Sequence, residues 1–265
     1  MGTSLPTIKG LFDLTGKSAL ITGGTGALGS MAAKALAGAG AGVTLAGGNR
    51  EKLDALVKEI NTGGCKAYGV NLRPDSEENV DTMIKAACDN GGGLDILVVA
   101  SGFNKPGNSQ QASMADFDSV MDANVRQTFL VCKAAGKVMM DAGNGGKMVI
   151  TSSVRGLVAT NNSIAYCTSK AATDMLTKCF SAEFAPSGIT VNAIAPTVFR
   201  SELTAWLFAE NGPGADARQG VLKRLPVGRL GEPSDFVGSL IFLSSPASDF
   251  MTGHVMYVDG GFVTV

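Results

Sequence analysis

The sequence has almost no net charge with which to attract a polyanion, since 22 Lys and Arg residues face 23 Asp and Glu residues in a chain of 265. Proteins that bind nucleic acid gather cations against the phosphates, so we expect no nucleic-acid partner. No run of about 18 consecutive apolar residues is present, so we expect no membrane-spanning helix and no membrane partner. The N-terminal segment MGTSLPTIKG also lacks the apolar core of a secretion signal.

Metal ligands and paired cysteines are scarce as well. The chain has a single histidine, and its five cysteines form no Cys-x-x-Cys pair. We therefore predict neither a metal site nor a disulfide framework. Unpaired cysteines are typical of a reducing compartment, and a cytoplasmic location is the simplest interpretation.

What the sequence does contain is a regular alternation of short apolar segments with helical patterns. The apolar segments, each closed by turn-forming residues, are 17–24, 41–47, 65–71, 94–102, 146–153, 188–196 and 254–261. The helical patterns between them cover 27–39, 50–60, 76–89, 114–141, 163–184 and 233–243. This order predicts a single α/β domain over residues 1–265, a doubly wound Rossmann fold with a parallel sheet of about seven strands flanked by helices. Ligands of such folds bind beyond the carboxyl ends of the strands.

The first of these strand ends is rich in glycine and reads TGGTGALGS before a helical pattern begins. Glycine allows the backbone to turn tightly against a pyrophosphate, and the N-terminus of a helix offers free N–H groups with a partial positive charge. We therefore predict that this turn binds a dinucleotide through Gly23, Thr25, Ala27 and Leu28. The alternative is a glycine-rich connection without a ligand.

The end of the second predicted strand, TLAGGNREKL, lacks the carboxylate that binds the ribose hydroxyls of NAD in such folds. Gly47 occupies the expected position, so no negative charge there repels a 2′-phosphate, and Arg50 is close enough in sequence to reach one. These residues favour NADP over NAD, although weakly. Arg50 could equally be a solvated residue of the first helical turn, and Asn49 is the first candidate to hold the ribose if NAD is preferred.

The segment SIAYCTSKAA places Tyr166 and Lys170 four residues apart, on one face of a predicted helix. Ser153 stands 13 residues before the tyrosine, just beyond a predicted strand. A phenol has a pKa of about 10, whereas an acid–base catalyst works best near a pKa of about 7, and a nearby ammonium group closes this gap by favouring the phenolate. The three residues therefore predict a proton-transfer site. The alternative is a packed tyrosine beside a lysine that reaches the surface.

Taken together, Tyr-x-x-x-Lys, the preceding serine and the glycine turn resemble the short-chain dehydrogenase/reductase family, from LTGKSALITGG to YVDGG. The resemblance implies that Tyr166 is the general acid or base and that Ser153 hydrogen-bonds the substrate oxygen. It also implies that Lys170 lowers the pKa of Tyr166 and binds the nicotinamide ribose. Asn124 matches the family's helix asparagine, which holds a water molecule in a proton relay; the alternative is an asparagine that only satisfies helix backbone.

Further cofactor contacts follow from the same resemblance, at the ends of the remaining strands. They are Asn71, Leu72, Ala100, Ser101, Gly102, Pro196, Phe199 and Ser201, in addition to Tyr166 and Lys170. Near the cofactor's carboxamide, Phe199 would contribute backbone atoms and Ser201 a hydroxyl. Core packing is the alternative for Phe199.

Several positions depart from the family pattern, which indicates that cofactor contacts are rearranged. Ala27 replaces a glycine of the first turn, Asn71 replaces an aspartate, and residues 99–102 read VASG in place of Asn-Asn-Ala-Gly. Thr197 follows Pro196 where a glycine is usual, and Gly48 stands where many NADP-preferring relatives carry arginine.

In this family the segment corresponding to about 197–226 folds over the substrate, which implies a lid. The segments LFDLTGK, FRSELT and LSSPASDFMTGHVMYVDGGFVTV look most like gluconate 5-dehydrogenases and related enzymes. We therefore expect an NAD(P)-dependent enzyme that interconverts a secondary alcohol and a ketone, on a sugar acid, polyol or similar small molecule.

Two other functions compete with this one. A 3-oxoacyl-thioester reductase would need an exposed basic patch beside the cleft for its acyl carrier protein, whereas a non-catalytic sensor or scaffold would bind nucleotide without turnover. The intact Ser153, Tyr166 and Lys170 favour an enzyme. The resemblance also implies a homotetramer or homodimer, paired through the long helical patterns at 114–141 and 163–184.

Overall fold

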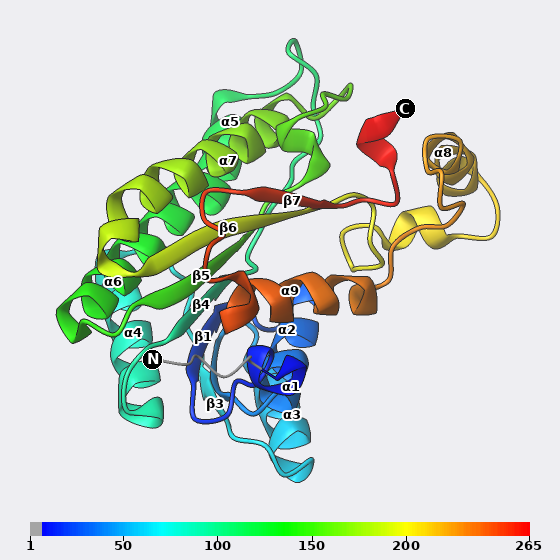
Figure 1. Ribbon diagram of the computed structural model, residues 1–265. Helices are drawn as coiled ribbons and strands as arrows, with labels where there is room; N and C mark the ends of the chain where they lie inside the picture. Colours follow the sequence, from blue (N-terminus) through cyan, green and yellow to red (C-terminus); the bar gives the residue numbers. More distant parts are fainter. Residues whose placement is uncertain (1–6) are drawn as a thin grey trace.

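Strands of one parallel sheet form the centre of the computed structural model, which describes residues 7–265 (Figure 1). They are β1 Ser18–Thr22, β2 Gly42–Ala46, β3 Ala67–Val70, β4 Ile96–Val99, β5 Gly146–Thr151, β6 Ile189–Pro196 and β7 Val255–Val258. The sheet order is β3-β2-β1-β4-β5-β6-β7, and every neighbouring pair is parallel. The direction of winding reverses between β1 and β4, which is where open α/β sheets bind ligands. The predicted doubly wound Rossmann fold is confirmed.

Helices cover both faces of this sheet (Figure 1). One face carries α2 (Ala27–Gly38), α3 (Arg50–Thr62) and α9 (Val237–Ser244); the other carries α4 (Glu77–Gly91), α6 (Gln127–Ala142) and α7 (Ile164–Phe184). Three further helices are α1 (Ile8–Leu11), α5 (Met114–Met121) and α8 (Pro213–Leu222). Short 3-10 turns occupy Val154–Gly156, Ala185–Ser187, Ala205–Phe208, Pro233–Phe236, Pro246–Ser248 and Phe262–Thr264.

The central strands β1 and β4 are buried along their whole length because helices cover both faces of the sheet there. All residues of β1 are buried; Ile21 packs in the cluster beneath α2, α3 and α9, whereas Leu20 packs in the cluster beneath α4, α6 and α7. Neighbouring residues of a strand point to opposite faces, which explains this division. Burial of one such side chain contributes about 1.5–3 kcal/mol, so the alternation fixes the register of each strand strongly.

The helical pattern expected at 114–141 is present but is not one regular helix. Between α5 and α6, residues Asp122–Arg126 form a π-helical turn. Its irregular backbone directs the Asn124 carbonyl toward two hydroxyl groups, and this oxygen accepts hydrogen bonds from Thr128 Oγ1 at 2.8 Å and Thr173 Oγ1 at 3.4 Å. Such turns inside α-helices occur often at functional sites.

The segment after β6 leaves the sheet and contains the 3-10 turn Ala205–Phe208 and α8. In Figure 1, α8 and the C-terminal 3-10 turn lie beyond the ends of β6 and β7. A small apolar cluster anchors this region to the rest of the chain, and its buried members are Val154, Leu225, Leu230 and Phe262. The region coincides with the segment that the family resemblance implies to be a lid.

Candidate active site

Most of the residues predicted to bind the cofactor and substrate follow strands or begin helices at one edge of the sheet. The glycine turn follows β1, Gly47 to Arg50 follow β2, Asn71 and Leu72 follow β3, and residues 100–102 follow β4. Ser153 follows β5, whereas Phe199 and Ser201 lie just beyond Pro196, the last residue of β6. Since all strands are parallel, their carboxyl ends meet at this edge and gather residues that are far apart in sequence.

Tyr166 lies in the first turn of α7, and burial and one hydrogen bond have the largest effects on the pKa of its phenol. Burial raises the pKa of Tyr166, because the phenolate would lose hydration, and a hydrogen bond with Ser153 acts in the opposite direction. Ser153 Oγ also accepts a hydrogen bond from the Arg155 backbone N–H at 3.1 Å, which holds the serine in place. Burial dominates, so the pKa of Tyr166 lies above its usual value of 10.0.

Lys170 lies one helical turn beyond Tyr166, and only 3% of it is exposed. Its Nζ donates to the Thr151 carbonyl at 2.9 Å and lies 5.7 Å from the centroid of the tyrosine ring. Burial lowers the pKa of Lys170 to about 8, with the Asp174 carboxylate acting in the opposite direction. The groups that lower the pKa of Tyr166 in this structure are Ser153 and Arg155, and burial outweighs them; that Lys170 lowers it stays a prediction.

Asn124 joins the loop after β4 to α7 through its side chain. Its Nδ2 donates to the Phe103 carbonyl at 2.8 Å and to Ser169 Oγ at 2.9 Å, while its Oδ1 accepts from the Phe103 N–H at 2.8 Å. The space above Gly102 is bordered by Asn124 Oδ1 and Lys170 Nζ, each 3.8 Å from the place that a Cβ would take. The side chain therefore positions this part of the site, and its role in a water relay stays a prediction.

The turn after β1 fits the phosphates of a dinucleotide. Helix α2 begins at Ala27, and its N-cap residue, Gly26, has no side chain to accept hydrogen bonds from the first-turn N–H groups. A Cβ on Gly29 would lie 2.1 Å from the Gly23 carbonyl oxygen, so only glycine allows the helix to approach the turn this closely. Opposite the turn, Ser101 Oγ is buried and has no hydrogen-bond partner within residues 7–265. These free donors match the oxygen-rich ligand that a pyrophosphate provides.

The turn after β2 is held by neighbours from other strands. The Gly47 N–H donates to the Val70 carbonyl at 3.2 Å, and Asn71 Nδ2 donates to the Gly47 carbonyl at 2.8 Å. Asn49 caps α3, because its Oδ1 accepts from the Lys52 N–H at 2.9 Å. That oxygen is therefore already engaged, which weakens the expectation that Asn49 holds a ribose hydroxyl.

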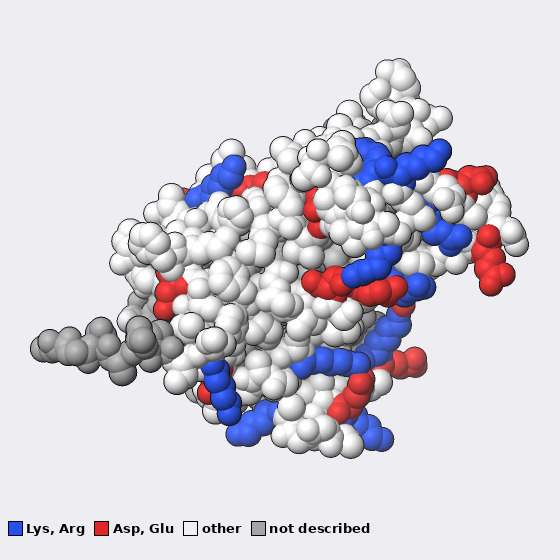
Figure 2. Space-filling view, turned by 45° about the vertical axis from the view of Figure 1, so that its right-hand side comes forward, with Lys and Arg blue, Asp and Glu red and all other residues white. Residues whose placement is uncertain are grey.

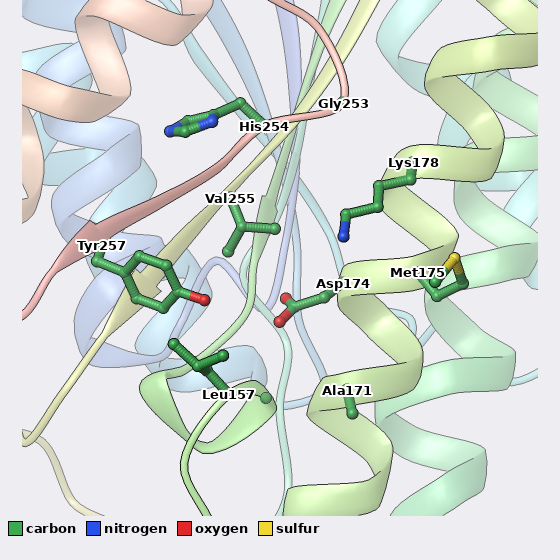
Figure 3. A pocket seen from close by; sticks show the side chains of 10 residues that line it. Leu157, Ala171, Asp174, Met175, Lys178, Gly253, His254, Val255 and Tyr257 are labelled. Atoms are coloured by element: carbon green, nitrogen blue, oxygen red, sulfur yellow. The ribbon is translucent and has the colours of Figure 1, made fainter. Parts of the chain in front are cut away.

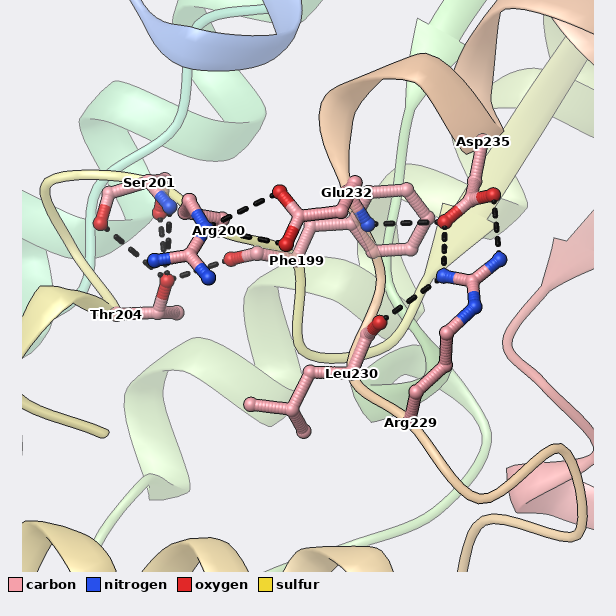
Figure 4. A network of polar contacts seen from close by, with 8 residues as sticks. All are labelled: Phe199, Arg200, Ser201, Thr204, Arg229, Leu230, Glu232 and Asp235. Carbon is pink, nitrogen blue, oxygen red and sulfur yellow. Dashed lines mark hydrogen bonds and ion pairs between the residues drawn. The ribbon is translucent and has the colours of Figure 1, made fainter. Parts of the chain in front are cut away.

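Ion pairs fix the beginning of the segment that follows β6 (Figure 4). Arg200 Nε donates to both carboxylate oxygens of Glu232 at 3.1 Å, and its guanidinium lies 3.9 Å from the centroid of the Phe208 ring. Thr204 Oγ1 donates to the Phe199 carbonyl at 2.5 Å and lies 3.0 Å from Ser201 Oγ. The Phe199 side chain is buried in the core, as its packing alternative proposed, and its backbone remains at the strand end.

Two cations that the sequence analysis did not select lie over one aromatic ring near the tyrosine. The Arg155 guanidinium is 5.2 Å and that of Arg224 is 4.1 Å from the centroid of the Phe262 ring. Burial lowers the pKa of Arg155, and the charge of Arg224 lowers it further, while Tyr166 acts in the opposite direction. Arg155 thus interacts electrostatically with both Tyr166 and Arg224. No local sequence motif predicts the contact of Arg155 and Arg224 with Phe262, since the three residues come from distant parts of the chain.

A separate cavity of about 350 Å³ lies between α7 and β7 (Figure 3). The Asp174 carboxylate and the Tyr257 hydroxyl point toward each other there, and His254 and Lys178 lie at its side. None of the residues predicted as catalytic lines this cavity.

Across residues 7–265, no helix combines the length and apolarity needed to cross a bilayer.

The chain is similar to known proteins over most of its length. A family model described as enoyl-(acyl carrier protein) reductase matches residues 24–263. The chain belongs to the short-chain dehydrogenase/reductase family. An uncharacterized oxidoreductase of Mycobacterium tuberculosis is 50% identical, with 95% of this chain and 93% of that protein covered. The 2-dehydro-3-deoxy-D-gluconate 5-dehydrogenase of Formosa agariphila is 35% identical, with 96% and 95% covered.

Among solved structures, a gluconate 5-dehydrogenase from Burkholderia cenocepacia in complex with NADP and tartrate superimposes with a TM-score of 0.91. It is 31% identical, and the match covers 98% of this chain and 100% of that one. This short-chain dehydrogenase/reductase is therefore an NAD(P)-dependent oxidoreductase, as the sequence predicted.

Proposed function

We propose that this short-chain dehydrogenase/reductase interconverts a secondary alcohol and a ketone on a small sugar acid. The observation that carries the proposal is the pair of arginines over Phe262. The ion pairs made by arginines within residues 7–265 involve Arg126, Arg200 and Arg229, so neither Arg155 nor Arg224 has a carboxylate partner there.

Two guanidinium groups over one ring repel each other unless an anion lies between or beside them. A planar carboxylate suits them, because the guanidinium fork matches its two oxygens. Arg155 is two residues from Ser153 and influences Tyr166, so a carboxylate held by this pair belongs to a molecule within reach of the catalytic hydroxyls. The tartrate in the Burkholderia cenocepacia complex is likewise a hydroxy acid, which supports the same substrate class.

The chemistry assigned to the side chains follows from their positions. The bound nicotinamide supplies or accepts the hydride. Tyr166 donates a proton to the substrate oxygen during reduction and removes it during oxidation, and the Ser153 hydroxyl hydrogen-bonds the same oxygen. Lys170 orients the ribose through Nζ and stabilises the phenolate when it forms. Asn124 positions Ser169 and the loop at Phe103, because its side chain hydrogen-bonds both.

For the cofactor, we infer a modest preference for NADP. Gly47 provides no carboxylate for the ribose hydroxyls, and Arg50 begins α3 immediately beyond the turn. The remaining predicted contacts line the same edge: Gly23, Thr25, Ala27, Leu28, Asn71, Leu72, Ala100, Ser101, Gly102, Pro196, Phe199 and Ser201. Two solved relatives bind NADP, and this supports the inference.

The alternative is a 3-oxoacyl-thioester reductase, since a 3-oxoacyl-[acyl-carrier-protein] reductase of Aquifex aeolicus is 33% identical over 94% of this chain. A carrier protein is acidic and needs a broad basic surface. Figure 2 looks toward the side that bears the lid segment, and Lys and Arg there alternate with Asp and Glu. The ion pairs Arg200–Glu232 and Arg229–Asp235 neutralise part of that surface. This mixed charge favours a small anion over a protein partner.

We further propose a single domain with a lid at about 197–226, a cytoplasmic location, and assembly as a homotetramer or homodimer. Support for assembly comes from apolar side chains left exposed on α6, α7 and the loop before α7. These are Phe129, Met140, Leu157, Ile164 and Met175. Sedimentation at micromolar concentration tests the proposal, and a monomer would contradict it.

The substrate class is tested by following nicotinamide absorbance with aldonic acids, the corresponding neutral polyols and 3-oxoacyl thioesters. We expect the highest kcat/KM with an acid. Arg224→Met and Arg155→Met should each raise the KM for the acid by about tenfold, the range of a charge-assisted hydrogen bond, and leave neutral polyols unaffected. Arg126→Met removes an exposed cation from another surface and serves as the control. A higher kcat/KM with thioesters or neutral polyols would reject the sugar-acid proposal.

The catalytic assignment has its own test. Tyr166→Phe keeps the ring and removes the proton donor, so kcat should fall by about 100-fold or more while NADPH still binds. Near-normal turnover in this variant would show that another group transfers the proton.

A further inference from the structure

Arg73 lies against the turn that follows β2, although it belongs to the loop after β3. The two strands pair in register, with Ala46 opposite Val70, so the residues beyond them continue side by side. The hydrogen bond from Asn71 Nδ2 to the Gly47 carbonyl, 2.8 Å long, ties the two loops together. Arg73 is therefore two residues from a fixed contact with the turn.

The side chain of Arg73 occupies the space that a side chain at position 48 would need. A Cβ on Gly48 would lie 2.5 Å from Arg73 Nε, 3.2 Å from its Cγ and 3.4 Å from its Cδ. Gly48 has no left-handed φ angle to explain its identity, so the absence of a side chain matters here for space. Because Gly48 has no side chain, the arginine can lie directly over the backbone of the turn.

The backbone of Arg73 is also restrained. Pro74 follows it and is buried, and a residue before proline is held in an extended conformation. Within the described part of the chain, the guanidinium nevertheless has no hydrogen-bond or ion-pair partner. Arginine side chains that make hydrogen bonds within residues 7–265 are Arg126, Arg155, Arg200, Arg218 and Arg229. Arg73 is exposed and pairs with none of the acidic side chains there.

We propose that Arg73 binds the 2′-phosphate of NADP and is the main determinant of cofactor choice in this enzyme. The inference rests on the proposed function and refines its cofactor assignment, which named Arg50. In doubly wound folds the adenosine ribose lies at the end of the second strand, where an acid selects NAD and a nearby arginine accommodates the 2′-phosphate. Here the acid is replaced by Gly47, and the guanidinium that lies over the turn comes from the neighbouring strand.

Arg50 is the competing cation, and its position differs in one respect. It is the first residue of α3, where its exposed side chain leaves the helix surface, whereas the stem of Arg73 lies over Gly48 itself. A cation whose stem is held against the turn loses less freedom on binding than a free surface arginine. Arg73 should therefore contribute more to phosphate binding than Arg50.

The experiment measures binding, not turnover. Calorimetric titration compares adenosine 2′,5′-bisphosphate with 5′-AMP, which differ only in the 2′-phosphate, and fluorescence titration compares NADPH with NADH. Arg73→Met keeps the length of the stem and should weaken the bisphosphate and NADPH by about tenfold, with 5′-AMP and NADH changed by less than about twofold. Lys58→Met, which removes an exposed cation from the far part of α3, is the control for net charge and should change neither.

A second perturbation changes no charge. Gly48→Ala places a methyl group where the Arg73 stem lies, so the guanidinium must move, and NADPH binding should weaken by about threefold or more. In the double variant Gly48→Ala/Arg73→Met no guanidinium is left for the methyl group to displace. The loss should then be no larger than in Arg73→Met alone, a non-additivity that a general disturbance of the turn would not produce.

The outcomes separate this inference from the proposed function. If the native enzyme binds neither NADPH nor NADH, the proposed function itself is wrong. If it binds them and Arg73→Met weakens both equally or neither, the assignment of Arg73 is wrong while the oxidoreductase remains. If Arg50→Ala weakens NADPH binding and Arg73→Met does not, Arg50 is the residue that binds the 2′-phosphate.

Discussion

Replacing Lys170 with methionine should stabilise the folded enzyme at neutral pH while it removes activity. Lys170 is buried, and burial lowers its pKa from 10.5 to about 8. At about pH 7 Lys170 is protonated in both the folded and the unfolded state. Its lowered pKa means that this charge reduces the free energy of unfolding by about 3 kcal/mol. The substitution also removes the hydrogen bond from Nζ to the Thr151 carbonyl, which is worth about 1 kcal/mol. A net gain of about 1–2 kcal/mol remains.

The stability difference between the native enzyme and the methionine variant depends on pH. Between the folded pKa of about 8 and the unfolded value of 10.5, the unfolded state binds more protons than the folded state. The free energy of unfolding of the native enzyme therefore rises with pH across that window, by about 2 kcal/mol from about pH 7 to about pH 9.5. The methionine variant lacks this titration, so its advantage should shrink by the same amount.

Urea unfolding at the two pH values, at one fixed protein concentration, measures the difference between native enzyme and variant. Titrating groups that do not interact with Lys170 cancel in that difference, whereas Asp174, whose pKa the Lys170 charge lowers, does not. A variant less stable than the native enzyme at neutral pH, or an advantage that does not change with pH, would refute the reasoning. NADPH turnover in the same samples should be lost.

Three other substitutions and modifications follow from the packing. Gly47→Asp should shift cofactor preference toward NAD, measured as the NADH to NADPH binding ratio, but only together with Thr25→Ala, because a Cβ on Gly47 would lie 2.9 Å from Thr25 Cγ2. Gly136→Ala should lower the free energy of unfolding by about 1–3 kcal/mol in a urea titration, because the new methyl group overpacks against the Phe184 ring, 2.4 Å away. Burial raises the pKa of Cys132 to about 12, so mass spectrometry should find its thiol unmodified by iodoacetamide until the protein unfolds.

The strands and their alternation with helices could be predicted because each strand is short, mostly apolar and followed by turn-forming residues. β1 and β4 are buried on both faces, and this burial is what produces a continuous apolar pattern. The π-helical turn at Asp122–Arg126 could not be predicted, because one extra residue in a turn hardly alters the spacing of apolar residues over a long helix. The sequence could place Asn124 in a helix, but it could not predict the hydrogen bonds that Asn124 makes to Phe103 and Ser169.

The candidate site divides in the same way. Tyr166 and Lys170 could be paired because a helix converts a spacing of four residues into a shared face. Arg155 and Arg224 meet only through the Phe262 ring, and Arg73 meets Gly48 only through the pairing of β2 with β3. Such contacts depend on how separate elements pack, so a local pattern contains no signal of them.

The directions of the two pKa changes bear on how the catalytic pair works. Burial raises the pKa of Tyr166 and lowers that of Lys170, because it disfavours the charged form of each group. At neutral pH the phenol therefore keeps its proton and is ready to donate it to the oxygen of a ketone. Oxidation of an alcohol requires the phenolate, which the Ser153 hydrogen bond and the charge of Arg155 stabilise against desolvation. The same burial thus favours the acid role at neutral pH and moves the base role toward alkaline pH.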